Sequence, residues 1–215
     1  MPNWEEFSVS GVSATTPYNI MLGAGTLYRD LTYSTEESKW SGTILGATSG
    51  GNKLTIKPEV TPIDVDGVLV EAKGLLQKTG ETAQIETNMV EVTKDFLKST
   101  VIGKEGTSQD SRFDVIESKP LIDDSDYIKN FAFVGFKTDG SPIIVLFDYA
   151  ISTEGLESDN KNKEASVIPA VYKCVAELVE GGATNKLPYH IYVPKATEST
   201  QTTQSSQTGD TSETA

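Results

Sequence analysis

Very few residues of this chain have the type and spacing that catalysis or metal binding requires. His190 is the only histidine and Cys174 the only cysteine among 215 residues, so a site with two histidines and an intramolecular disulfide are both excluded. His190 stands between Tyr189 and Ile191 on an expected short strand, with no obvious nucleophile beside it. We therefore expect His190 to be structural and Cys174 to pack as a small hydrophobic side chain.

The segment from Gly46 to Lys53 comes close to a phosphate-binding loop. It contains Gly-x-x-x-x-Gly, but Asn52 separates Gly51 from Lys53, whereas such a loop has its lysine directly after the glycine. A strand is expected after this segment, and a true phosphate-binding loop leads into a helix. We therefore interpret these residues as a flexible glycine-rich loop without nucleotide binding.

The remaining candidates for chemistry are carboxylates. Asp123, Asp124 and Asp126 form a small acidic cluster, but it lacks the glycine and the distant glutamate of a calcium loop, so a solvated turn is the preferred interpretation. The chain has 31 acidic residues, and a pair at glycosidase spacing stays open as an alternative. No Gly-x-Ser-x-Gly, Cys–His or dinucleotide signature occurs. We expect no catalytic, metal or cofactor site, and no enzyme.

Composition and charge narrow the classes of partner. The formal net charge is −13, of which −3 comes from Glu198, Asp210 and Glu213, leaving −10 on the body. Arg29 and Arg112 are the only arginines, which argues against ordinary binding to a phosphate backbone. The first ten residues lack the apolar core of a signal peptide, and the longest apolar run, 143–147, is too short to span a bilayer. We expect a soluble protein of a reducing compartment, with no membrane partner.

The elements that would position functional residues are mainly strands. Residues 83–92 alternate, with Ala83, Ile85 and Met89 on the side suited to a core, and the opposite face is polar. A short helix should follow from the N-cap Thr93 to Gly103, with Leu97 and Val101 on its apolar side. Before them come a polar arm (1–17), a strand (18–28), a long polar loop (31–52), a strand ending near residue 60, a turn at 66–67 and a second strand.

The second half of the chain predicts more strands. Residues 127–137 and 143–151 flank Thr138-Asp139-Gly140-Ser141, and Asp-Gly between apolar runs is the strongest hairpin signal in the sequence. Further strands are expected at 113–117, 165–178 and 187–193, before a Ser/Thr/Gln-rich tail (196–215) that should be disordered. The fold class predicted is mostly β: one domain (18–195), a β-sandwich or partly closed barrel of about eight strands with one short α-helix.

The order of these parts resembles the major tail protein (tail tube protein) of long-tailed, non-contractile bacteriophages. The similar residues are grouped in five stretches. They are Gly46 to Gly51 entering a strand that ends near Pro58-Glu59-Val60, Asp64 to Gly67, Gly74-Leu75, the strand with Glu86 and Met89 before the helix 93–102, and Phe147 to Ile151 with Gly155-Leu156. The resemblance covers roughly residues 18–193.

This resemblance implies a structural virion protein, assembled in the host cytoplasm into stacked hexameric rings. Partners would be other copies of the chain, the tape-measure protein, the tail terminator and baseplate or distal tail proteins, with DNA only in transit. Gln84, Glu86 and Asn88 would face the lumen, where Glu86 would repeat as a ring of carboxylates. The loop 31–52, with Trp40, Gly46, Gly50 and Gly51, and the N-terminal arm would connect stacked rings.

Two other interpretations stay open beside a hydrolase that would use a pair of carboxylates. One is the tube subunit of a contractile tail or a secretion system, which has a related architecture. The other is a monomeric β-sandwich that binds carbohydrate, which would normally present exposed Trp and Tyr on one face.

Overall fold

The fold is built around a large antiparallel sheet, as the computed structural model of residues 10–160, 162–163, 165–182 and 184–195 shows. In chain order, these ranges contain the 3-10 helix η1 (Thr16–Asn19), β1 (Met21–Ser34), β2 (Lys39–Ile44), β3 (Thr48–Pro62), β4 (Leu76–Met89), α1 (Lys94–Val101), β5 (Gly103–Gly106), β6 (Val115–Ser118), the 3-10 helix η2 (Asp124–Asp126), β7 (Ile128–Lys137), β8 (Pro142–Ser152), β9 (Ile168–Cys174) and β10 (Tyr189–Tyr192).

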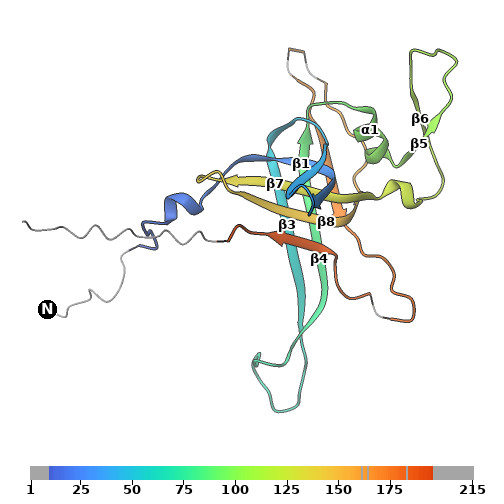
Figure 1. Cartoon of the computed structure of the whole chain (residues 1–215). Helices are drawn as coiled ribbons and strands as arrows, with labels where there is room; N and C mark the ends of the chain where they lie inside the picture. Colours follow the sequence, from blue (N-terminus) through green and yellow to red (C-terminus); the bar gives the residue numbers. More distant parts are fainter. Residues whose placement is uncertain (1–9, 161, 164, 183, 196–215) are drawn as a thin grey trace, which may run out of the picture.

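Eight strands form the main sheet, in the order β2-β1-β7-β8-β9-β4-β3, with β10 also paired to β8. Because β7 occupies one edge of β8, β10 and β9 share the other edge, at 144–147 and 150–152 respectively. The path of paired strands ends at β2 and β3, so the sheet remains open. Figure 1 shows the β3–β4 hairpin crossing the β1, β7 and β8 strands steeply. The predicted mostly β fold with one short α-helix is confirmed.

The β7–β8 hairpin lies at the centre because both of its faces are buried. Phe131 and Phe147 point into the main core, between the two halves of the sheet, whereas Ala132 and Leu146 belong to a second cluster on the opposite face. A strand covered on both faces has a continuous apolar sequence, as residues 143–147 do. The hairpin and its turn are as predicted, and Gly140 adopts the positive φ of 81° that the turn needs.

Helix α1 closes one end of the main core. The Thr93 side chain accepts a hydrogen bond from the Phe96 amide, as expected for its N-cap. The expected apolar side, Leu97 with Val101, is only partly correct, because the buried helix residues are Phe96 and Thr100 and Val101 is exposed. The left-handed C-cap is Ile102, and Gly103 instead begins β5.

The largest correction concerns residues 31–52, for which the sequence predicts a long loop. They contain the end of β1, all of β2 and the start of β3. Leu31 and Leu45 are buried, and β2 pairs with β1 from Ile44 to Lys39. Polar Ser/Thr/Gly-rich strands carry little apolar periodicity of their own, so their pairing partner decides their structure.

Other differences are smaller. The second strand expected after the 66–67 turn and the strand 83–92 form one strand, β4, and the strand expected at 113–117 begins at Val115 and pairs with β5, which was not predicted. Residues 1–9 of the expected arm and the expected disordered tail (196–215) lie outside the described residues. Within the described ranges, the helices are too short or too polar to traverse a lipid bilayer.

Candidate assembly surface

The most prominent feature outside the core is the β3–β4 hairpin. Its two strands pair from Thr48 with Met89 to Pro62 with Leu76. Only the half near the body is supported, because β9 pairs with β4 no further than Gln84. Residues 57–62 and 76–79 are exposed on both faces of the ribbon, and Figure 1 shows the hairpin projecting from the body. An isolated two-stranded ribbon is marginally stable in water.

The two strands are joined by residues 63–75, which we call the tip loop. The Ile63 amide donates to the Leu75 carbonyl at 2.7 Å and the Val68 amide donates to the Val65 carbonyl at 3.1 Å. Gly67 and Gly74 have φ values of 88° and 96°, which favour glycine. The predicted turn at 66–67 is thus present, at the end of a long hairpin.

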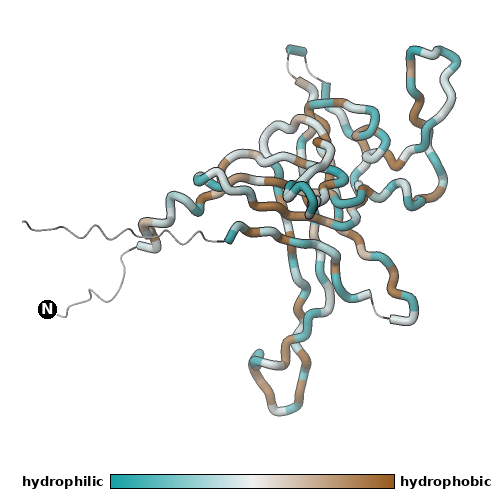
Figure 2. The backbone as a smooth tube through the Cα atoms, in the orientation of Figure 1, coloured by the Kyte–Doolittle hydropathy of each residue, from teal (hydrophilic) through white to brown (hydrophobic). Residues whose placement is uncertain are grey.

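The tip loop and the strand ends beside it expose a group of apolar side chains, which we call the tip cluster. Its members are Val60, Ile63, Val65, Val68, Leu69, Val70 and Leu76. Leu69 is 96% exposed and Val70 77% exposed. Figure 2 shows this apolar character at the end of the projecting hairpin. Contiguous exposed apolar groups of this kind mark interaction sites.

Sequence reasoning missed the tip cluster, although a signal was present. Residues 60–76 carry many aliphatic side chains on both sides of the Asp66-Gly67 turn. That pattern predicts two strands joined by the turn and does not indicate that their ends are exposed. Whether such a hairpin packs on the body or projects from it depends on tertiary contacts.

The predicted lumen-facing residues lie on one face of β4. Gln84, Glu86 and Asn88 are half-buried, while Ala83, Ile85, Thr87 and Met89 are buried on the other face. The alternation predicted from the sequence is therefore confirmed. Whether the polar face borders a lumen is a question of assembly.

The charge on this face differs from the expected ring of isolated carboxylates. Lys53 Nζ lies 2.8 Å from Glu86 Oε1, and Gln84 Nε2 donates to the same oxygen at 3.1 Å. These hydrogen bonds, from Lys53 first and Gln84 second, lower the pKa of Glu86. Lys57 and Lys173 stand on the same face, opposite Thr82 and Gln84 respectively. With three lysines beside the paired Glu86, the face is not predominantly negative.

Trp40 does not lie in a mobile loop. It is on β2, where its ring centroid is 5.4 Å from that of Tyr33 and 5.0 Å from that of Tyr192 on β10. It also packs against the second core cluster, which contains Leu31 and Val134. Trp40 thus holds β2 and β10 together within one chain, and its role as a connector between rings stays a prediction.

The three glycines of the expected stacking loop have backbone roles. Gly50 and Gly51, with φ values of 76° and 87°, form the irregularity where the β3–β4 register shifts between Thr48 and Asn52. A Cβ at Gly46 would lie 2.8 Å from the Met89 methyl carbon. Next to these glycines, the side-chain Nδ2 of Asn52 donates a hydrogen bond to the Ala24 carbonyl at 2.8 Å, which links β3 to β1.

Two of the three aspartates in the acidic cluster are ion-paired with one lysine of the same chain. Lys119 Nζ lies 2.7 Å from Asp123 Oδ2 and also contacts Asp126, and its side chain is 8% exposed. Asp123 caps η2, and hydrogen bonds from Lys119 first and Ser125 second lower its pKa to about 2. The cluster thus forms the predicted turn, in which Asp123 and Asp124 are exposed and Asp126 is buried against Lys119.

The single histidine and cysteine occupy different environments. His190 is exposed on β10, and its Nε2 lies 3.3 Å from Asp148 Oδ1. Cys174 is buried in the main core, where burial first, and the charges of Asp148 and Glu81 next, raise its thiol pKa to about 12. A thiol with that pKa stays protonated and unreactive at neutral pH.

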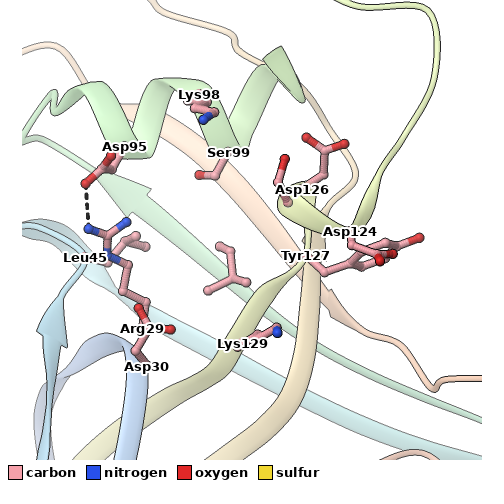
Figure 3. A pocket seen from close by; sticks show the side chains of 12 residues that line it. Arg29, Asp30, Leu45, Asp95, Lys98, Ser99, Asp124, Asp126, Tyr127 and Lys129 are labelled. Carbon is pink, nitrogen blue, oxygen red and sulfur yellow. Dashed lines mark hydrogen bonds and ion pairs between the residues drawn. The ribbon is translucent and has the colours of Figure 1, made fainter. Parts of the chain in front are cut away.

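One open cavity of about 430 Å³ lies beside α1. Figure 3 shows Arg29 paired with Asp95 at one side of it, and Asp124 and Tyr127 at the other. Lys129 comes from β7 between them. The lining mixes both signs of charge with few apolar groups, so it does not define a class of ligand.

Comparison of the chain with models of known protein families gave no match, and comparison with curated proteins gave none. The assignment of function therefore rests on the residues and their geometry.

Proposed function

We propose that this chain is the tube subunit of the tail of a long-tailed, non-contractile bacteriophage. Copies assemble into hexameric rings that stack into a tube, in the host cytoplasm, and become part of the virion tail. The tape-measure protein fills the lumen during assembly, and the tail terminator and the baseplate or distal tail proteins bind the two ends. DNA passes through the lumen without being retained.

The observation that carries this proposal is the projecting β3–β4 hairpin. Both faces of its outer half and the apolar side chains of its tip are exposed in the single chain. A marginally stable ribbon with an apolar end gains stability when another protein surface covers it. The open sheet adds unpaired edges at β2 and β3, which are available for pairing between subunits.

The polar face of β4 suits the lining of a channel. On this face Glu86 pairs with Lys53, and Lys57 and Lys173 are its further cationic groups. Strong retention of DNA needs several lysine or arginine contacts to phosphates. Pairing of Lys53 with Glu86 would reduce the attraction of this lining for DNA phosphates.

The experiment is negative-stain electron microscopy of the purified full chain over a range of concentrations. Rings or tubes of uniform diameter are expected. Isolated small particles at every concentration, together with a monomeric mass in sedimentation, would contradict the proposal. Immunogold labelling of virions with antibody to the chain should decorate the tail along its length.

A tube subunit of a contractile tail or secretion system is the nearest alternative. It shares the assembly but requires a sheath protein around the tube. Co-assembly with the products of neighbouring genes separates the two, because a sheath would bind the outer surface of the tube.

One observation bears on the carbohydrate-binding alternative. The structure gathers Tyr33, Trp40 and Tyr192 at one place, which the sequence did not indicate. The ring plane of Trp40 is inclined by 57° to that of Tyr33 and by 70° to that of Tyr192, so the three rings do not form a flat platform for sugar rings. Binding to a glycan array that is lost in Trp40→Phe would nevertheless favour this class.

A further inference from the structure

A second group of exposed apolar side chains lies at the end of the sheet where β1 begins and β7 ends. This sheet-end patch consists of Tyr18, Ile20, Met21, Leu22, Phe136 and Val193. Leu22 pairs with Phe136, and Phe136 pairs with Pro142 on β8. Val193 directly follows β10, which runs beside β8. The patch therefore lies on β1 and β7 and on the segments just before β1 and just after β10.

The patch is also held in place by the backbone. The Thr138 amide donates to the Ile20 carbonyl at 2.8 Å, which fixes the segment before β1 against the end of β7. The patch is thus a preformed surface on the body, whereas the tip cluster is at the end of a projecting ribbon. Figure 1 shows the hairpin tip and this end of the sheet in different parts of the molecule.

The two surfaces also differ in charge. The tip loop carries exposed Asp64, Asp66 and Glu71 against Lys73. Beside the sheet-end patch, Lys137 Nζ is paired with Asp139 Oδ2 at 3.2 Å, and Lys195 is exposed. On a chain with a net charge of −13, the exposed Lys195 gives this flank the sign of charge that complements an acidic, apolar tip.

We propose that the tip cluster of one copy docks on the sheet-end patch of a second copy. This inference rests on the proposed self-assembly and assigns the two surfaces that meet. Because the surfaces are different, the contact is heterologous, so every added copy presents a new tip or a new patch. Such a contact continues along a stack or around a ring, whereas a tip-to-tip contact would stop at a dimer.

Cysteine cross-linking tests the docking directly. Leu69→Cys and Leu22→Cys chains are mixed and oxidised, and a disulfide-linked heterodimer is expected, because the native Cys174 is buried and does not compete. In the control, Leu178→Cys replaces Leu69→Cys. Leu178 is 92% exposed, as Leu69 is almost fully exposed, but it lies in the segment after β9 and is no part of the tip cluster. Equal yields with Leu178→Cys, or no heterodimer, would overturn the proposal.

Complementation distinguishes a heterologous from a tip-to-tip contact. Leu69→Asp and Leu22→Asp should each weaken self-association roughly tenfold or more, since each buries a charge in an apolar contact. Mixing the two variants should restore one contact, between the intact tip of one and the intact patch of the other, and so give 1:1 dimers that do not grow. If Leu69→Asp loses self-association while Leu22→Asp associates as the wild type does, the contact is tip-to-tip. That result would contradict the proposal.

The same variants separate this inference from the tail-tube role. Regular tubes formed by Leu69→Asp would disprove the docking and leave the tail-tube function standing. A specific heterodimer from a chain that never forms rings or tubes would leave the docking standing and disprove the tail-tube function.

Discussion

The indole of Trp40 lies edge-on to the ring of Tyr192, with the centroids 5.0 Å apart and the planes at 70°. The first residue is on β2 and the second on β10, so this contact joins strands from opposite ends of the chain. It closes the second apolar cluster, around Leu31 and Val134, against solvent. The stretch 31–52 is therefore part of the fold, and an inter-subunit role for Trp40 would have to coexist with this one.

Replacing Trp40 with alanine should destabilise the subunit. Loss of a partly buried aromatic side chain, with two ring contacts, should reduce the free energy of unfolding by about 2–3 kcal/mol. Urea unfolding followed by circular dichroism measures the change, and Trp40→Phe should recover part of it. An unchanged midpoint for Trp40→Ala would show that the contact with Tyr192 contributes nothing in solution.

Gly50→Ala should also destabilise the subunit, for a backbone reason. The φ of 76° at Gly50 lies in the left-handed region, which costs other residues roughly 1–2 kcal/mol. Space is not the cause, since a Cβ there would meet only Asn88 Nδ2 at 3.7 Å. Gly11→Ala is the matched control, because nothing lies within 4 Å of its Cβ position and its φ is not in that region. Equal thermal midpoints for the two variants would contradict the assigned bulge.

Glu86→Lys tests whether the polar face of β4 borders the lumen. The change places a second ammonium group beside that of Lys53, on a face that already carries Lys57 and Lys173. Tubes should still form, since the half-buried Glu86 lies outside the apolar core, and DNA ejection should slow, most at low ionic strength.

Glu86→Gln is the control for that experiment, because it removes the ion pair without adding positive charge. Ejection from Glu86→Gln particles should lie between that of the wild type and that of Glu86→Lys. Normal ejection from Glu86→Lys particles at low salt, with the substitution verified in the tail, would remove this face from the lumen.

Acid should loosen the turn around η2. The folded pKa of Asp123 is about 2, below its ordinary value of 3.8, because Lys119 and Ser125 hydrogen-bond to the carboxylate. A lowered folded pKa stabilises the fold above the unfolded pKa, and this contribution is lost as pH falls from about 4 to about 2. Asp123→Asn should show a smaller loss of stability over that window in pH-dependent thermal melts. The same slope in both proteins would show that the Asp123–Lys119 pair does not contribute.

Several local features were predicted because short-range chemistry specifies them. Asp139-Gly140 between two apolar runs identified the β7–β8 hairpin, since few turns other than those of hairpins accept that pair so readily. Thr93 marked the start of α1, because its hydroxyl can cap the helix without help from the rest of the chain. The alternation around Ile85 identified which face of β4 is buried.

Only the tertiary structure decided the rest. Residues 31–52 are too polar to show strand periodicity, and they become strands because β1 and β4 supply backbone partners. The sequence could not show that Lys53 would neutralise Glu86, because register places them together across two strands. Nor could it show that residues 60–76 project from the body. The same aliphatic sequence suits a hairpin that packs on the body and a hairpin whose tip is exposed. Residues close together in the sequence determine local hydrogen bonds and side-chain periodicity. Strand pairing and burial depend on which distant segments of the chain pack against a given segment.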